Sequence, residues 1–159
     1  MNFLYSLRNR LIEVVAPVGP LALRLWLAQE FARAGVTKLA GGFSAPEWFA
    51  SLAFPFPVSL FSSDFNWAVA GGAEILLGLM LLFGLFGRVA AAGLIFITYV
   101  AIYSVHFDLG WQGWEQIETD QGLGFKVPLM MVLMLVSLLA GGMGRWSVDA
   151  WWKSRRIGA

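Results

Sequence analysis

The sequence predicts an all-α membrane protein, a bundle of four transmembrane helices preceded by a short N-terminal interfacial helix. The chain has 159 residues, of which 58% are hydrophobic and 13% charged, and its mean hydropathy is +0.70. A chain this short cannot bury so much apolar surface inside itself, so the excess is expected to face lipid. Four apolar stretches can each be extended toward the roughly 20 residues that a spanning helix needs. None alternates with the period of two that a membrane β-barrel shows.

Composition also excludes several classes of protein. The apolar excess argues against a soluble enzyme, and the formal net charge of +1 supplies no basic surface for nucleic acid. The chain has no cysteine, which removes disulfides, iron–sulfur clusters, thiolate zinc sites and cysteine nucleophiles. No haem or nucleotide motif is found either, so the cofactor is left open, with a quinone as one candidate.

The first element is expected to be a helix lying on the membrane surface. Its apolar residues fall near one helical face, whereas Arg8 and Glu13 lie elsewhere; the apolar residues are Phe3, Leu4, Leu7, Leu11 and Ile12. No small-residue cleavage site follows, so the segment does not read as a removable signal peptide. An amphipathic helix of this kind lies in the interface before Pro17 and Pro20 open the first span.

The four spans are predicted at residues 18–35, 66–86, 89–107 and 125–143, within a single domain covering 1–159. No repeat or linker divides the chain. Glycines concentrated in the spans are expected to let helices approach closely. Between spans one and two, the run Phe54-Pro55-Phe56-Pro57 cannot form a regular helix, so it should lie in the interface or fold back over the mouth of the bundle.

Charge distribution predicts the orientation. Lys and Arg flank the termini and the turn between spans two and three, whereas the loop between spans three and four is acidic. Both termini are therefore expected in the cytoplasm of a bacterium, with the protein in its inner membrane. Arg88, in the turn, is expected to anchor that orientation and to cap the C-terminus of span two, where the helix dipole favours a cation.

Charges within the spans are expensive and mark candidate sites. At 100° per residue, Arg24 and Lys38 lie on one stripe of span one, and Glu74 of span two falls between them in depth. Glu74 either forms a salt bridge with Arg24 or Lys38 that locks the two helices together, or it serves a polar pocket that opens outward. Glu30 and Arg33 lie on the far side of span one, one turn apart, and are expected to pair with each other near the outer boundary of the membrane.

His106, the only histidine, shares a face with Tyr103 at the end of span three. It could be a hydrogen-bonded interfacial residue. It could also hold a metal ion with carboxylates of the following loop, such as Asp108, although no recognised ligand spacing supports that. A third alternative is a quinone site, in which the His106 or Tyr103 side chain donates a hydrogen bond to a ring carbonyl.

Short motifs follow one another through spans one to three: Arg24-x6-Phe31-x2-Ala34-Gly35-x2-Lys38-Leu39, Gly72-x-Glu74-x3-Gly78, Gly84-Leu85 and Arg88-x-Ala90. This ordered set resembles the DoxX family of small four-helix membrane proteins. Two further runs resemble the HvfX branch of that family: Ser104-Val105-His106-Phe107 with Gly110-Trp111, and Gly144-Arg145-Trp146-Ser147-Val148-Asp149 before Trp151.

The resemblance implies a link with thiosulfate:quinone oxidoreduction or with membrane complexes of thiol and oxidative-stress defence. The resemblance to the HvfX branch implies an association with gene clusters that make copper-related, post-translationally modified peptides. The positions carried over from the family are Arg24, Lys38, Glu74, Arg88 and His106. The third loop is shorter than in longer relatives, so a function housed in that loop does not transfer.

Together these observations predict a bacterial inner-membrane protein whose outward-facing polar pocket binds a small redox or metal-linked ligand. Arg24 and Lys38 are expected to donate to an anion or carbonyl, Glu74 to act as counter-ion or proton carrier, and His106 with Tyr103 to lie at the mouth. The protein would be the membrane component of a quinone-linked redox system or of copper-related peptide maturation, and catalysis of its own is left open. Its partners are the lipid bilayer, soluble redox or peptide-maturation proteins and, if it oligomerises, further copies. Two alternatives remain: a proton-coupled transporter or export factor using Glu74, and a non-catalytic anchor that holds soluble partners through its basic C-terminal tail.

Overall fold

The computed structural model describes residues 12–157 and is mostly helical. The predicted interfacial helix falls largely on residues 1–11 and lies outside the described residues. The elements in chain order are α2 (Val18–Ala40), α3 (Glu47–Ala50), η1 (Val58–Leu60), α4 (Ser63–Phe83), α5 (Gly87–Val105), η2 (Gly110–Glu115), β1 (Glu118–Thr119), β2 (Gly122–Leu123), α6 (Lys126–Gly141) and α7 (Val148–Ile157).

Three stretches of described helix are long and apolar enough to cross a membrane: Ile12–Ala40, Ser63–Phe83 and Gly87–Val105. Their mean hydropathies are 1.2, 1.6 and 1.7. Helix α6 is also apolar but has 16 residues, fewer than the roughly 20 that a straight span needs. The helical membrane character of the chain is therefore confirmed, with three candidate spans and a shorter apolar helix in place of the predicted four spans.

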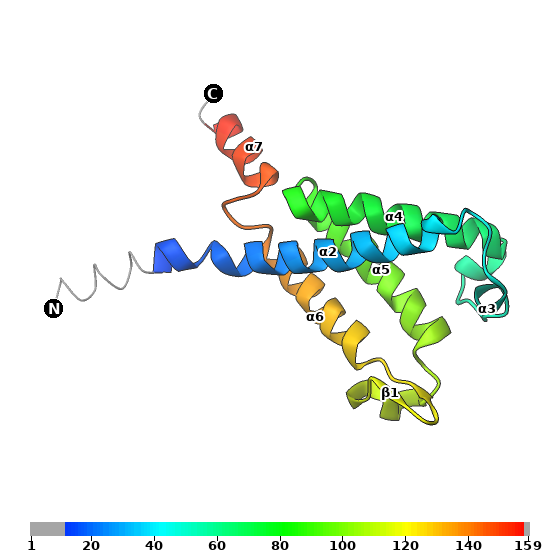
Figure 1. Ribbon diagram of the computed structural model, residues 1–159. Coiled ribbons are helices and arrows are strands. Elements are labelled where there is room, and N and C mark those ends of the chain that lie inside the picture. Colours follow the sequence, from blue (N-terminus) through cyan, green and yellow to red (C-terminus); the bar gives the residue numbers. More distant parts are fainter. Residues whose placement is uncertain (1–11, 158–159) are drawn as a thin grey trace.

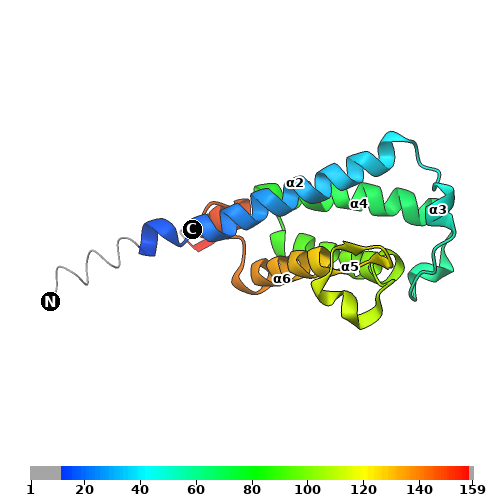
Figure 2. The ribbon, with the colours of Figure 1, turned by 60° about the horizontal axis from the view of Figure 1, so that its bottom comes forward.

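The helices form two antiparallel pairs, α2 with α4 and α5 with α6, as Figures 1 and 2 show. We call one end of the bundle the terminal end, because α2 begins there, α4 turns into α5 there, and α7 lies beside that turn. The opposite end, the loop end, holds α3 and the short hairpin of β1 and β2 (Figure 1). In the hairpin Glu118 pairs with Leu123 and Thr119 with Gly122.

Small residues bring α2 and α4 into close contact. A Cβ atom added at Gly35 would lie 2.5 Å from the carbonyl oxygen of Gly71, and one added at Gly78 would lie 3.3 Å from that of Ala28. The expectation that glycines serve close helix packing is confirmed at these positions. It is wrong at Gly72, where an added Cβ would meet nothing within 4 Å.

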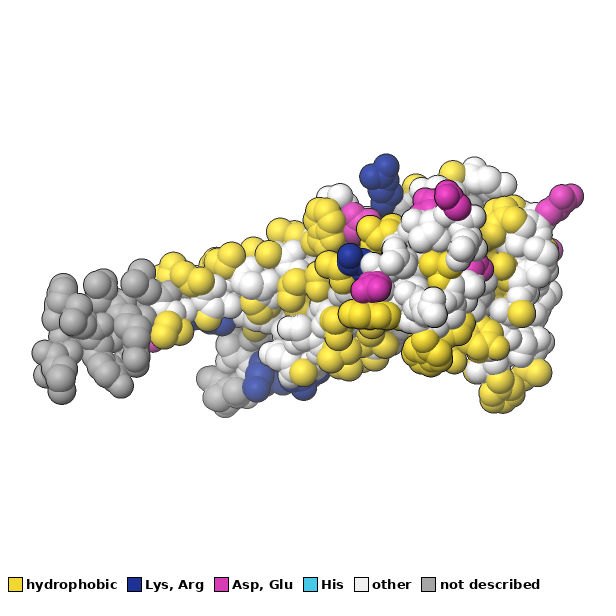
Figure 3. Space-filling model, turned by 90° about the horizontal axis from the view of Figure 1, so that it is seen from below, with side chains coloured by type: hydrophobic (Ala, Val, Ile, Leu, Met, Phe, Trp, Pro, Cys, Tyr) yellow, Lys and Arg dark blue, Asp and Glu magenta, His cyan; other side chains and the backbone are white. Residues whose placement is uncertain are grey.

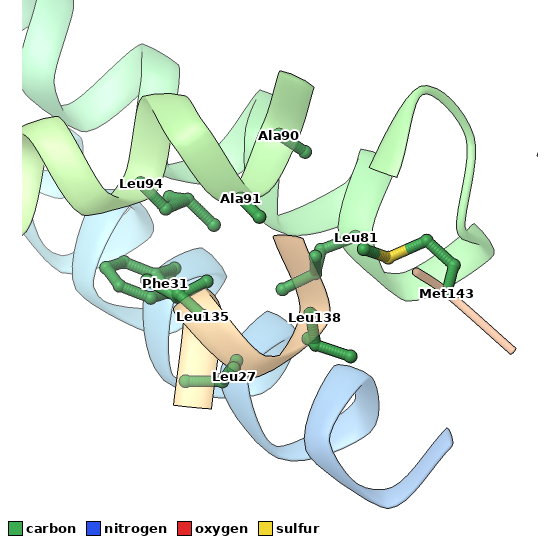
Figure 4. Packing of buried hydrophobic residues seen from close by; sticks show 9 residues of the cluster. All are labelled: Leu27, Phe31, Leu81, Ala90, Ala91, Leu94, Leu135, Leu138 and Met143. Carbon is green, nitrogen blue, oxygen red and sulfur yellow. The ribbon is translucent and has the colours of Figure 1, made fainter. Parts of the chain in front are cut away.

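The apolar core joins the two pairs (Figure 4). Its buried members come from four helices and the segment after α6: Leu27, Phe31, Leu81, Ala90, Ala91, Leu94, Leu135, Leu138 and Met143. Many large apolar side chains point outward instead, and Figure 3 shows them spread over one face of the molecule. Such a surface suits lipid rather than water.

Candidate functional site

A cavity of about 320 Å³ opens between α4 and α5 toward the loop end. Segments far apart in the sequence line it: Lys38; Trp48, Phe49, Phe54 and Val58; Asn66, Val69, Ala70 and Glu74; and Phe96, Ile97, Val100, Ala101, Ser104, Val105 and His106. The lining is apolar and aromatic except for a few polar groups at the two extremes of the cavity.

The aromatic roof of the cavity is built by the chain between α2 and α4. The ring of Phe49 lies 4.9 Å from that of Trp67 and 5.0 Å from that of Phe54, measured between centroids. Asn66 donates to the carbonyl oxygen of Val58 at 3.1 Å and so fastens this segment to the start of α4. The Phe54–Pro57 run thus folds back over the bundle, which is one of the two arrangements that the sequence predicts.

Lys38 and Glu74 form an ion pair at the inner extreme of the cavity. The Lys38 ammonium donates to both carboxylate oxygens of Glu74, at 2.9 and 2.8 Å. Glu74 is buried, with 7% of its side chain exposed, against 25% for Lys38. Since an ammonium has three N–H groups, the third has no partner among the described residues.

This pair lies deeper in the bundle than the sequence suggests. Glu74 is about 16 Å from the start of α4 at Ser63 and about 14 Å from its end at Phe83, at 1.5 Å per residue. The sequence predicts that Lys38 lies at the mouth of the bundle. It lies instead beside the middle of α4. The reason is that α2 ends at Ala40 beside the middle of α4, and the roof segment covers it.

Ser104 and His106 provide polar groups at the end of the cavity nearest the loop end of the bundle. Ser104 Oγ and His106 Nδ1 are buried and have no hydrogen-bond partner among the described residues. Burial lowers the pKa of His106, and this outweighs the raising effects of hydrogen bonding with the Gly124 backbone and of the Asp108 charge. The imidazole is therefore neutral at pH 7, with Nδ1 able to donate or accept depending on its tautomer.

Tyr103 and Asp108, both predicted to act near His106, lie outside this cavity. Tyr103 does not line it and is 51% exposed, with its ring 6.5 Å from that of Tyr99. Asp108 accepts a hydrogen bond from the Leu123 N–H at 3.1 Å and thus supports the hairpin. Among residues 12–157 no cluster of three or more His, Asp or Glu residues suited to a metal ion is present.

Arg24 lies at the terminal end, away from the cavity and from Glu74. It is 2% exposed and donates to four backbone carbonyls: Leu81 at 3.0 Å, Leu82 at 2.6 Å, Met143 at 3.0 Å and Trp146 at 2.8 Å. The first two belong to the last turn of α4, where a cation is favoured; the Leu81 carbonyl also accepts from the Gly84 N–H at 3.1 Å. The expectation that Arg24 faces the same pocket as Lys38 is therefore wrong, because its side chain points toward the opposite end of the stripe.

Further contacts at the terminal end join α7 and the segment before it to the turn between α4 and α5. The sequence did not predict that these residues lie together. Asp149 of α7 accepts hydrogen bonds from the Phe86 and Gly87 N–H groups, both at 2.8 Å, and thereby caps α5. Gly84 adopts the left-handed conformation (φ 63°), and a Cβ there would lie 2.5 Å from that of Ser147. The Gly84-Leu85 motif and the Gly144–Asp149 motif therefore meet around Arg24.

Two further expectations are corrected here. Arg88 does not cap α4, a role that Arg24 fills; it is exposed and reaches the Ala140 carbonyl at 3.4 Å. Lys38–Glu74 is the one ion pair within residues 12–157, so Glu30 and Arg33 do not pair with each other. Arg33 is exposed and Glu30 is half-buried.

Residues 19–107, from α2 to the end of α5, match the family model described as DoxX. The chain belongs to the DoxX family. A relative in Haemophilus influenzae, described as an uncharacterized protein, is 37% identical over 134 residues, which cover 83% of this chain and 82% of the relative. No solved structure matches the chain. The DoxX match contains Arg24, Lys38, Glu74 and His106, and it ends before α6 and α7.

Most of the cavity lining escaped sequence reasoning. The aromatic residues Trp48, Phe49 and Phe54 lie in a connection whose path the sequence does not specify. Ser104 stands out in the sequence only as part of a motif, and Phe96 has no local signal because an apolar residue in a span ordinarily faces lipid or core. Asn66 offered the clearest signal, as an amide just inside an apolar stretch.

Proposed function

We propose that this DoxX protein binds a membrane-soluble compound with a flat ring and carbonyl oxygens, of the quinone class, in the cavity between α4 and α5. The observation that carries the proposal is the pair of buried, unpartnered polar atoms, Ser104 Oγ and His106 Nδ1, in an otherwise apolar lining. Buried polar atoms are nearly always hydrogen-bonded, so two such atoms at one cavity favour a ligand that completes them.

The shape and lining of the cavity support this class of ligand. Its volume of about 320 Å³ lies at the lower end of the range for small-molecule sites. The rings of Trp48, Phe49 and Phe54 from the roof segment and of Phe96 from α5 provide apolar and aromatic contact. A lipid-soluble ring would enter from the bilayer between α4 and α5, where Val69 and Phe96 line the cavity and are 49% and 47% exposed.

The polar residues would orient the ring. Ser104 and His106 donate to, or accept from, a carbonyl or hydroxyl at the outer extreme, and the third N–H of Lys38 does so at mid-depth. Glu74 holds the Lys38 ammonium in place through both of its oxygens. A bound quinone would supply two-electron redox chemistry, and the electrons would come from a partner protein.

Under this proposal the protein is the membrane component of a quinone-linked redox system or, if it belongs to the HvfX branch, of copper-related peptide maturation. We further propose that α6 is a fourth crossing, that both termini are cytoplasmic in a bacterial inner membrane, and that the cavity opens on the outer side. The shared end of the two described termini supports this arrangement (Figure 1).

Extraction of bound lipids from the purified protein tests the proposal. Wild-type protein in mild detergent is expected to retain a quinone, detected by mass spectrometry at near-stoichiometric amount. The double variant Ser104→Ala/His106→Phe should lose it. Tyr103→Phe, which changes the residue next to Ser104 but lies outside the cavity, should keep it. Absence of quinone from wild type, even after incubation with added ubiquinone or menaquinone, would refute the proposal.

A proton-coupled transporter is the second candidate, favoured by one observation: a carboxylate lies near mid-depth beside a cavity. In that case the Glu74 carboxylate would bind and release the coupled proton, and Lys38 would be its local counter-ion. Proton uptake by protein-loaded vesicles that depends on Glu74 but needs no quinone would favour this candidate over the first.

A further inference from the structure

One face of α2 carries polar side chains on the outside of the bundle. We call it the α2 outer face, and its members are Trp26, Gln29, Glu30, Arg33 and Thr37. Trp26 is 56% exposed, Gln29, Arg33 and Thr37 are exposed, and Glu30 is half-buried. None of the four polar side chains has a hydrogen bond or ion pair with any residue in 12–157.

This face lies opposite the functional stripe of α2 and near mid-depth. Arg33 follows Arg24 by nine residues, about 180° around the helix. Its neighbours along the helix fix its depth: Ala32 faces Gly78, and Gly35 faces Glu74 and Gly71. Arg33 is thus level with the middle of α4 and lies about 10 Å before the end of α2 at Ala40.

An exposed guanidinium and a half-exposed carboxylate at that depth are costly in lipid, and such charges normally face protein or water. Neither α4 nor α6 covers Arg33 in a single copy. The charges within this face are also of opposite sign and one turn apart, so the face is complementary to itself.

We propose that the α2 outer face is the interface of a homodimer whose two-fold axis runs along the membrane normal. Such an axis keeps both copies at the same depth and brings α2 of each against the other, with the same patch used twice. Arg33 and Glu30 lie about 60° apart around the helix, with Thr37 between them. With Thr37 facing the axis, Glu30 of each copy meets Arg33 of the other, giving two reciprocal ion pairs. This inference does not rest on the proposed ligand.

The absence of cysteine makes a direct test available. Thr37→Cys places one thiol on the α2 outer face, and Leu76→Cys places one on an outward position of α4, where the native side chain is 59% exposed. On oxidation in native membranes, Thr37→Cys should give a disulfide-linked dimer, and Leu76→Cys should remain monomeric. Equal cross-linking of the two variants, or none with Thr37→Cys, would overturn the proposal.

Charge reversal tests whether the two charges decide the pairing. In the Thr37→Cys background, Glu30→Arg alone and Arg33→Glu alone should each lose the covalent dimer, because like charges then meet across the axis. Coexpression of these two variants with different tags should restore a mixed dimer that carries both tags. Folded yield in detergent verifies that each variant inserts. Failure of the mixed dimer to form between folded variants, or stoichiometric capture of a different membrane protein that Arg33→Glu abolishes, would rule out a second copy as the occupant.

Discussion

Lys38 donates to both carboxylate oxygens of Glu74, at 2.9 and 2.8 Å, and so joins the end of α2 to the middle of α4. The pair is at once a wall of the cavity and a link between two helices. The same two residues can therefore line a ligand cavity and also hold α2 against α4. Their contributions can be separated by experiment because stability and ligand binding are different measurements.

Removing one partner of this pair should destabilise the fold. Glu74→Gln leaves the Lys38 ammonium with a weaker partner, and breaking one side of a buried pair costs about 3–5 kcal/mol. The double variant Lys38→Met/Glu74→Gln should lose less than the sum of the two single variants, because neither charge is then left alone. Melting temperatures of the four proteins in detergent measure this coupling. Additive losses would show that the pair does not stabilise the bundle, and normal melting with normal function in cells would exclude both roles for Glu74.

Arg24→Lys should be more harmful than its conservative chemistry suggests. The guanidinium donates to four carbonyls from one planar group, which a lysine ammonium cannot reproduce. Hydrogen bonds from charged groups are each worth about 1.5–3 kcal/mol, so a loss of about 3 kcal/mol or more in the free energy of unfolding is expected. Arg88→Lys is the matched control, since Arg88 is exposed and makes one long contact, and its effect should stay within about 0.5 kcal/mol. Equal unfolding curves for the two variants would contradict the role given to Arg24.

Asp149→Ala should release α7 from the turn between α4 and α5. The carboxylate caps α5 through two N–H groups, and loss of such a cap costs about 1–2 kcal/mol. Asp149→Asn, which keeps one acceptor oxygen, should cost less. Asp120→Ala removes an exposed carboxylate in the turn of the hairpin and serves as the control. Thermal unfolding and protease sensitivity after residue 147 report the result; an Asp149→Ala protein as stable and as resistant as the control would refute the capping role.

Reporter fusions test the orientation. A reporter after Trp152 is expected to be active in the cytoplasm, and one inserted in the 112–121 segment is expected to be active outside, because basic residues remain on the cytoplasmic side. The same pair of fusions tests the fourth crossing, since α6 separates the two positions. Both reporters on one side would show that α6 does not cross, and exchanged sides would place the cavity toward the cytoplasm.

The difference between expected and observed positions is clearest for the two cations of α2. Periodicity correctly places Arg24 and Lys38 on one stripe, because the angle between residues on a helix is fixed. It does not fix which way each long side chain turns along the stripe. Arg24 turns to the carbonyls at the end of α4 and Lys38 to Glu74, and both choices depend on where α4 ends and turns.

The aromatic roof of the cavity shows a second feature that the sequence alone does not predict. The sequence predicts that Phe54–Pro57 is irregular, since proline removes the N–H that a helix needs. Where an irregular segment lies depends on contacts with residues distant in the chain. Asn66 and Trp67 of α4 provide those contacts, and they turn the connection into a wall of the cavity.

The sequence by itself determined that this protein is a helical membrane protein of the DoxX type, and which intramembrane charges call for partners. These properties follow from local composition and from the fixed geometry of a helix, together with an ordered set of short motifs. The tertiary structure alone decided that Lys38 rather than Arg24 pairs with Glu74, that Asp149 and Arg24 fasten the terminal end, and that Ser104 and His106 share a cavity with a distant aromatic segment. Those outcomes depend on the relative depth of α2, α4 and α5, which no pattern within a single helix encodes; between α2 and α4 it is set by close packing at Gly35, Gly71 and Gly78.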